Sequence, residues 1–305
     1  MIAEPMRALE RFFFEPQTTA PMTLVRMAWG AVMAVWSLSL LPDVDPFLTT
    51  GALRYDLPTP AGSWNPLDAI GWTAAPLVTC VLLLGAAVAT AVGYRTRLAS
   101  MVAVLCLRAL QRTNVTVYTS GDLFLRQIGI AVALSPCGLL WSLDARRARQ
   151  QGRTTALWRA PWAMRLLQLE VAVGYLLSGW AKARGDTWRD GRALELALRI
   201  EDLQRVRAPE WVFGNPNVLS MLTTATVAFE LGFIFLVWNR RLRPWVLGAG
   251  VAFHLGVDIF LDVGFFSIAM WIAYLAFIVP SIADRIVRRV SASSQPVPLA
   301  VQPAQ

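Results

Sequence analysis

The chain has 305 residues, of which 56% are hydrophobic and only 16% are charged. A soluble domain carries about 25% charged residues, so this composition excludes an ordinary soluble enzyme and predicts an integral membrane protein. The net charge of +8 does not indicate nucleic-acid binding, because the arginines lie between apolar segments, as in membrane proteins with basic cytoplasmic loops. We therefore expect the lipid bilayer as a partner, and no nucleic acid.

Residues 1–21 precede the first long apolar segment. They include three glutamates, which distinguishes them from the basic start of a signal peptide. Met6, Leu9 and Phe13 fall on one side of a helix at 100° per residue. This segment is predicted to be a cytoplasmic amphipathic helix.

Eight apolar segments approach the length of about 20 residues that a helix needs to cross a bilayer. They are residues 22–41, 73–93, 98–118, 122–141, 162–181, 217–238, 244–262 and 266–283. The predicted fold is therefore an all-α bundle of about eight transmembrane helices.

The basic residues predict the orientation of this bundle. Arginines are concentrated before the first segment, after the last one and in every second connection, which places both termini in the cytoplasm. The transmembrane domain is expected to span residues 22–285, with outer loops at 42–72 and 183–216, and residues 286–305 to form a disordered cytoplasmic tail. These features predict a multi-pass protein of the cell membrane, plasma or inner.

The fifth segment carries a polar face. Tyr175, Ser178 and Lys182 lie on one side of this helix, and Lys182 is the only lysine in the chain. A desolvated lysine can lose its proton, whereas arginine in practice cannot. Lys182 is therefore a candidate base, and the alternative is a lysine that extends to the membrane interface.

The seventh segment contains His254, Asp258 and Asp262 at a spacing of four residues. His254 is the only histidine, and Asp258, one turn away, is expected to orient its imidazole. The alternative for His254 is a hydrogen-bonded core residue. We predict no metal site, because no second histidine is present.

The third and fourth segments contain further polar residues, Asn114, Asp122 and Arg126 among them. Asp122 and Arg126 are expected to form an ion pair one helical turn apart. Glu230, deep in the sixth segment, is a candidate partner for Arg108.

One stretch of the chain resembles a known family. Residues 169–194 read LEVAVGYLLSGWAKARGDTWRDGRAL, and Tyr175, Gly179, Lys182, Trp188 and Gly191 carry the resemblance, with one extra residue between Lys182 and Trp188. This pattern is similar to the signature of the vitamin K-dependent γ-carboxylase and its bacterial relatives, the horizontally transferred transmembrane (HTTM) domain proteins. Residues 112–144 and 253–266 also resemble this family.

The resemblance implies that Lys182 acts as a base toward a reduced quinone of the vitamin K type. His254 is the second expected catalytic residue, and no metal is implied. The residues expected to line the substrate pocket are Asn114, Asp122, Arg126, Tyr175, Trp188 and Asp258. A helix predicted near 190–204 would cover this pocket.

Two functional hypotheses follow, and the sequence alone leaves open whether the protein is an enzyme. The first is a carboxylase-like membrane enzyme, a carbon–carbon lyase or oxidoreductase, that handles a reduced quinone or another lipid-soluble substrate at the outer membrane face. The second is a non-catalytic accessory protein for maturation or export of a secreted peptide, similar to the protein that helps to mature a sporulation-delaying toxin. A transporter is less well supported, because we find no internal repeat.

Overall fold

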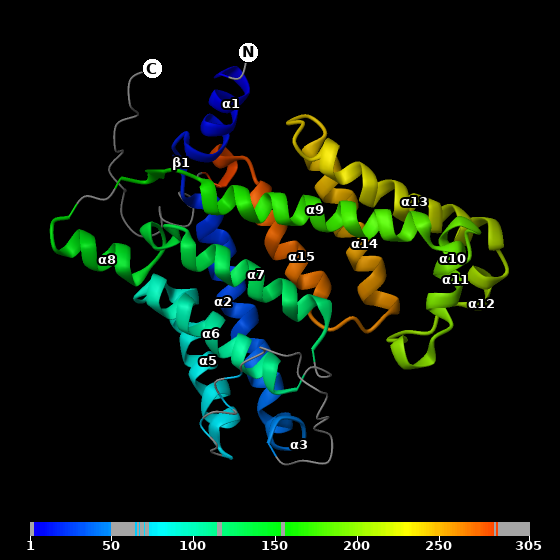
Figure 1. The fold of residues 1–305 in the computed structure, drawn as a ribbon, viewed down its shortest axis with the longest axis horizontal. Helices are drawn as coiled ribbons and strands as arrows, with labels where there is room; N and C mark the ends of the chain where they lie inside the picture. Colours follow the sequence, from blue (N-terminus) through cyan, green and yellow to red (C-terminus); the bar gives the residue numbers. More distant parts are fainter. Residues whose placement is uncertain are drawn as a thin grey trace. The chain divides into compact units, whose positions relative to one another are not determined.

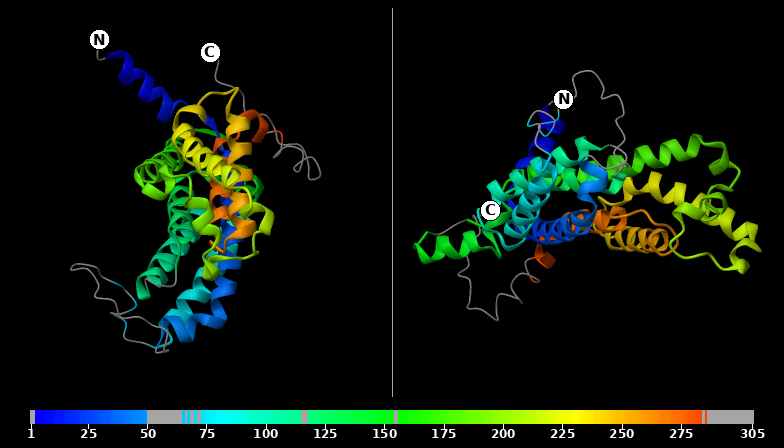
Figure 2. Two further views of the ribbon diagram at one scale, coloured as in Figure 1. Left: turned by 90° about the vertical axis from the view of Figure 1, so that its right-hand side faces the viewer. Right: turned by 90° about the horizontal axis from the view of Figure 1, so that it is seen from below.

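The computed structural model describes residues 3–49, 65, 67, 70, 73–114, 118–153, 156–283 and 285, and these are mostly helical (Figures 1 and 2). The predicted tail and most of the predicted outer loop 42–72 lie outside the described residues. The chain divides into two units. The first comprises Met1–Leu167 and Leu275–Gln305, and the second comprises Gln168–Tyr274.

The first unit is built on helices that pack around α2. Its helices are α1 (Ala3–Phe14), α2 (Ala20–Leu40), α3 (Val44–Leu48), α5 (Ala75–Val92), α6 (Thr96–Thr113), α7 (Ser120–Leu134) and α8 (Leu143–Gln150), with 3-10 turns at Leu41–Asp43, Cys137–Leu139 and Leu275–Phe277. Strands β1 (Gln17–Thr18) and β2 (Trp158–Arg159) pair antiparallel, with Gln17 opposite Arg159. Helices α2, α5 and α6 lie side by side (Figure 1).

Helix α2 is held by polar side chains as well as by apolar packing. Arg26 is fully buried, and its guanidinium donates to the carbonyl oxygens of Thr90, Ala91 and Trp141 at 2.5–2.9 Å. The carbonyls at the end of a helix have no partner within the helix, so Arg26 satisfies the end of α5. Trp29, also buried, donates through Nε1 to the Leu125 carbonyl at 2.7 Å.

A second polar contact joins α8 to the start of α6. The carboxylate of Asp144 accepts hydrogen bonds from the Arg95 amide at 2.8 Å, and from the amide and hydroxyl of Thr96 at 2.7 Å each. Burial opposes ionisation of this carboxyl, but these hydrogen bonds and the charge of Arg147 outweigh it and lower the pKa of Asp144 below its usual value. Asp144 therefore caps α6 from a different helix.

The second unit contains three long helices and the short elements that connect them. Its elements are α9 (Trp162–Arg184, which begins in the first unit), α10 (Asp186–Arg189), α11 (Ala193–Leu198), a 3-10 turn (Glu201–Leu203), α12 (Glu210–Phe213), α13 (Pro216–Leu236), α14 (Arg243–Phe260) and α15 (Phe266–Tyr274). Helices α13 and α14 diverge from the turn that joins them (Figure 1).

The connection between α9 and α13 differs from the single helix predicted near 190–204. It forms the short helices α10, α11 and α12, and Gly191 separates the first two with a φ of 71°, a conformation that ends a helix. Leu198, Ala208 and Leu219 form a small apolar core beneath this connection. The sequence pattern thus found the apolar face but overestimated the length of the helix.

The connection is also fixed to the end of α14. The Arg205 amide donates to the Phe260 carbonyl at 3.0 Å, and the Asp262 amide donates to the Leu203 carbonyl at 2.7 Å. The Arg205 guanidinium lies 3.0 Å from Asp262 and 3.7 Å from Asp258. Backbone and charge together hold this loop in place.

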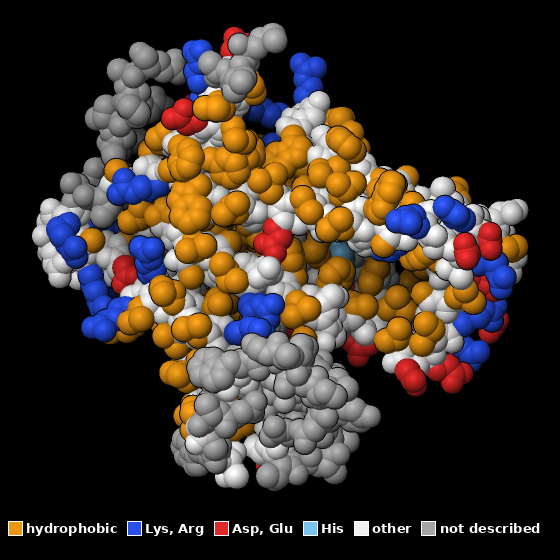
Figure 3. Space-filling model, viewed as in Figure 1, with side chains coloured by type: hydrophobic (Ala, Val, Ile, Leu, Met, Phe, Trp, Pro, Cys, Tyr) orange, Lys and Arg blue, Asp and Glu red, His pale blue; other side chains and the backbone are white. Residues whose placement is uncertain are grey.

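A helix lies at each of the eight predicted segments in the described part of the chain. Among the described residues, three helical stretches are long and apolar enough to cross a membrane: Ala20–Leu48, Ala75–Val92 and Pro216–Leu236. The other segments are shorter or carry more charged or polar residues, which lowers their hydropathy. Apolar side chains cover much of the face drawn in Figure 3, and such a surface suits lipid contact.

We expect Asp144→Asn to lower the free energy of unfolding by about 1 kcal/mol, because the variant loses a charged cap. The native pKa of Asp144 is lowered, so its stabilisation is complete above the ordinary carboxyl pKa of about 4 and is lost as the pH falls through the lowered value. Denaturant unfolding in detergent at several pH values measures both effects. The difference in free energy of unfolding between wild type and Asp144→Asn should become smaller in acid. The control Asp190→Asn changes an exposed residue, and its free energy of unfolding should stay close to that of wild type at every pH.

Candidate functional site

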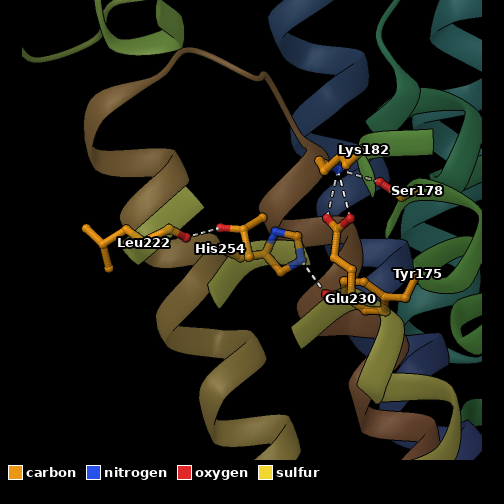
Figure 4. Close-up of polar contacts among 7 residues, drawn as sticks. Tyr175, Ser178, Lys182, Leu222, Glu230 and His254 are labelled. Atoms are coloured by element: carbon orange, nitrogen blue, oxygen red, sulfur yellow. Dashed lines mark hydrogen bonds and ion pairs between the residues drawn. The ribbon is translucent and has the colours of Figure 1, made fainter. Parts of the chain in front are cut away.

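The second unit contains an ion pair between two helices. Lys182 of α9 donates through Nζ to both carboxylate oxygens of Glu230 on α13 at 2.9 Å, and to the Ser178 hydroxyl at 2.6 Å (Figure 4). The Glu230 side chain is 5% exposed and that of Lys182 is 23% exposed. The three donors of the ammonium group are therefore all used, while part of the lysine remains accessible.

A glycine allows these helices to approach closely. A Cβ atom at Gly179 would lie 2.9 Å from Cβ of Glu230 and 3.0 Å from the Leu231 amide nitrogen, which is too close for any other residue without a shift of α13. Small residues at helix crossings serve this purpose in membrane proteins. Gly179 thus brings Glu230 within reach of Lys182, which lies one turn further along α9.

Tyr175, one turn before Gly179, begins a second polar group. Its hydroxyl shares a hydrogen bond of 2.7 Å with Nε2 of His254 on α14, and it also bonds the hydroxyl of Tyr274 on α15. All three side chains are buried, and the His254 carbonyl accepts from the Ser267 hydroxyl at 3.1 Å. In the described residues, Nδ1 of His254 is buried without a hydrogen-bond partner.

Aromatic rings surround this hydrogen-bonded group. The centroid of the His254 ring lies 5.0 Å from that of Phe253 and 5.3 Å from that of Phe266. The Tyr175 ring lies 4.4 Å from Phe233 and 5.5 Å from Phe229. The polar groups are therefore enclosed by flat apolar surfaces. In such surroundings each hydrogen bond is stronger, and each polar atom without a hydrogen-bond partner costs more free energy.

Trp188 covers the lysine from the following helix. Lys182 Nζ lies 5.3 Å from the centroid of the Trp188 ring, within the range of a cation–π interaction. Gly191, which allows the chain to turn back, packs so closely on Ser220 of α13 that a Cβ there would overlap its hydroxyl. The five residues of the sequence signature thus share one region of the second unit.

Two predicted contacts of this region are wrong. Asp258 does not orient His254, because the imidazole bonds Tyr175 instead, and the Asp258 carboxylate lies 3.7 Å from Arg205. Glu230 bonds Lys182, and so is not the partner predicted for Arg108. In each case the side chain pairs with a residue on another element of its own unit. The spacing of residues along one helix does not predict such a partner.

The remaining predicted site residues lie in the first unit. Asn114 is buried and donates through Nδ2 to the Phe47 carbonyl at 2.9 Å. Asp122 accepts from Nε1 of Trp36 at 2.7 Å and from the Thr119 amide at 2.6 Å. These contacts fix the end of α6 and the start of α7.

The predicted ion pair between Asp122 and Arg126 is not formed. The Arg126 guanidinium donates to the Gln111 side-chain oxygen at 2.7 Å, while both oxygens of Asp122 bond Trp36 and Thr119. The start of α7 carries a capping box in which Thr119 and Asp122 satisfy each other's backbone amides. Because its carboxylate caps α7, Asp122 does not pair with Arg126, which lies one turn further along the helix.

Sequence reasoning missed two members of the site. The pairing of Glu230 with Lys182 had a signal, since Glu230 is the only acidic residue between 217 and 238 and Lys182 is the only lysine. Tyr274 had none, because a tyrosine in an apolar segment is usually a packing residue. Only the crossing of α15 with α9 and α14 brings its hydroxyl to Tyr175.

These features define a class of protein: a helical membrane protein whose buried charged and polar groups bond one another inside a largely apolar chain. The model of the HTTM domain family matches residues 14–281. The chain belongs to this family. No curated protein and no solved structure matches the chain.

We expect Glu230→Gln to lower the free energy of unfolding by about 2–3 kcal/mol, because it leaves the ammonium of Lys182 without a counter-charge. Unfolding in detergent measures this loss. Combining it with Lys182→Met should recover most of the stability, because no unpaired charge then remains. Glu195→Gln is the matched control, since it breaks a more exposed pair with Arg199 and should cost less than about 0.5 kcal/mol. If Glu230→Gln and Glu195→Gln lost equal free energy of unfolding, the buried Lys182–Glu230 pair would have no special role in stability.

Proposed function

We propose that this protein is a γ-carboxylase-like membrane enzyme that removes a proton from a lipid-soluble hydroxyl compound, of which a reduced quinone is the leading example. Lys182 is the base. The observation that carries the proposal is the Lys182 amine, held by Ser178 and Glu230 on a side chain that is partly exposed. Arginine occupies every other basic position in the chain apart from His254, and arginine does not serve as a base.

Glu230 gives Lys182 a route to the neutral form. As an ammonium ion, Lys182 uses all three N–H groups and has no free electron pair. Transfer of one proton to the Glu230 carboxylate leaves a neutral amine, which can accept the proton of a bound hydroxyl group. The ammonium that then forms is stabilised by Ser178, and the proton held by Glu230 passes to water, which restores the carboxylate and its ion pair with Lys182. Lys182 and Glu230 act together in this scheme.

The surroundings fit a flat, oxygen-bearing ring. Phe229, Phe233, Phe253 and Phe266 supply apolar faces, and Nδ1 of His254 is a buried hydrogen-bonding atom with no partner among the described residues. A reduced quinone supplies a hydroxyl whose deprotonation prepares the ring for reaction with oxygen. His254, held by Tyr175, would orient one ring oxygen, while Trp188 covers the lysine.

The proposal includes the finer topology predicted from the sequence. We propose about eight spans, with both termini in the cytoplasm and the protein in the plasma or inner membrane. The alternation of arginine-rich connections supports this topology. Asp258 remains a proposed pocket residue, although its carboxylate lies 3.7 Å from Arg205. Asn114, Asp122 and Arg126 belong to the first unit, where each has a structural partner, and the proposed site of the second unit does not use them.

The test compares wild type with Lys182→Arg, which keeps the positive charge and removes the base. Each purified protein is incubated with reduced menaquinone or phylloquinone under oxygen, and the quinone epoxide is measured by mass spectrometry. We expect wild type to form epoxide and Lys182→Arg to lose at least about 100-fold in rate, the usual contribution of general-base catalysis.

Arg184→Lys is the matched control, because it changes an exposed cation two residues along the same helix. It should retain the wild-type rate, and thermal unfolding should show that all three proteins are folded. Epoxide formation by folded Lys182→Arg would refute the role of Lys182 as base. Absence of epoxide from every protein would exclude the quinone reaction tested.

The alternative proposal is an accessory protein for a secreted peptide. Its support is the exposed apolar surface of the connection between α9 and α13, where Ile200, Val206 and Trp211 are about half exposed or more. It predicts that Lys182→Arg is tolerated and that a peptide copurifies with the protein. Mass spectrometry of the purified preparation distinguishes it from the enzyme.

A further inference from the structure

Three arginines of the first unit form a cluster without a carboxylate partner in the part of the chain that the structure describes. Arg108 and Arg112 lie one turn apart on α6, and the guanidinium of Arg126 on α7 reaches Gln111, the neighbour of Arg112. Arg108 lies within electrostatic range of both Arg112 and Arg126. Like charges at this spacing destabilise a helix, so the arrangement is unfavourable by itself.

The one acidic residue close to the cluster in the sequence already has other partners. Asp122 is the only aspartate or glutamate between residues 69 and 143, and its oxygens bond Trp36 and Thr119. Nε of Arg112 is buried and has no hydrogen-bond partner among the described residues. A buried guanidinium N–H without an acceptor is costly, and a bound anion would relieve this cost.

We propose that Arg108, Arg112 and Arg126 bind a phosphate group between α6 and α7. Guanidinium groups bind phosphate oxygens through paired hydrogen bonds, and they stay charged when partly buried. A phosphate group supplies several acceptor oxygens and the negative charge that the cluster lacks. The inference uses residues of the first unit only and does not depend on the proposed quinone reaction.

The phosphate has two possible sources, a lipid headgroup and free phosphate. Arg112 is close to the end of α6, and Arg126 lies in the second turn of α7. The cluster is therefore near the connected ends of two helices, which in the proposed topology is a membrane surface, where headgroup phosphates lie. The experiment has one arm for each source.

The protein is purified in a detergent without phosphate and titrated with dioctanoyl phosphatidic acid, or with inorganic phosphate. Binding is measured by native mass spectrometry and by the shift in thermal unfolding temperature. We expect wild type to bind at least one of the two probes. Arg112→Gln should weaken that binding by at least about tenfold, because it removes a charge-assisted pair of hydrogen bonds.

Arg97→Gln is the matched control, since it removes an exposed arginine from the other end of the same helix and should bind as wild type does. Arg112→Lys keeps the charge and should retain intermediate affinity, which separates lost recognition from lost folding. Binding of phosphatidic acid alone identifies a lipid headgroup, and equal binding of both probes identifies a phosphate site. If wild type binds neither probe, or if Arg97→Gln weakens binding as much as Arg112→Gln, the proposal is wrong.

Discussion

Buried charged groups in an apolar helical protein have little or no water to hydrate them, and the rest of the structure depends on this constraint. Each buried charge must find its partners within the chain or bind a ligand. Arg26 bonds the carbonyls at the end of α5, Asp122 bonds Trp36 and Thr119, and Lys182 bonds Glu230 and Ser178. The packing of the helices is therefore set by polar contacts as well as by apolar area.

The same constraint identifies the places where function is expected. Most buried polar groups in the described residues are satisfied, so the exceptions carry information. Nδ1 of His254 and Nε of Arg112 are two such exceptions. The first is enclosed by aromatic rings and suits the oxygen of a flat ring. The second belongs to a cluster of positive charge and suits an anion.

Each of the five residues that carry the family resemblance has a structural role in the second unit. Gly179 allows α9 and α13 to approach, which brings Glu230 to Lys182. Tyr175 binds the imidazole of His254, and Trp188 lies over the lysine. Gly191 permits the turn that returns the chain to α13. The spacing of these residues was readable from the sequence because they lie within one helix and the short turn that follows it.

By itself, the sequence determined the class of the protein and the positions of the helices at the eight apolar segments, and it singled out Lys182 and His254 as candidates. These depend on composition and local periodicity, which are properties of neighbouring residues. Tertiary structure decided the partners: Glu230 for Lys182, Tyr175 for His254 and Gln111 for Arg126. Such pairs join different helices, so they depend on where helices cross, and a helical repeat specifies only which residues share a face.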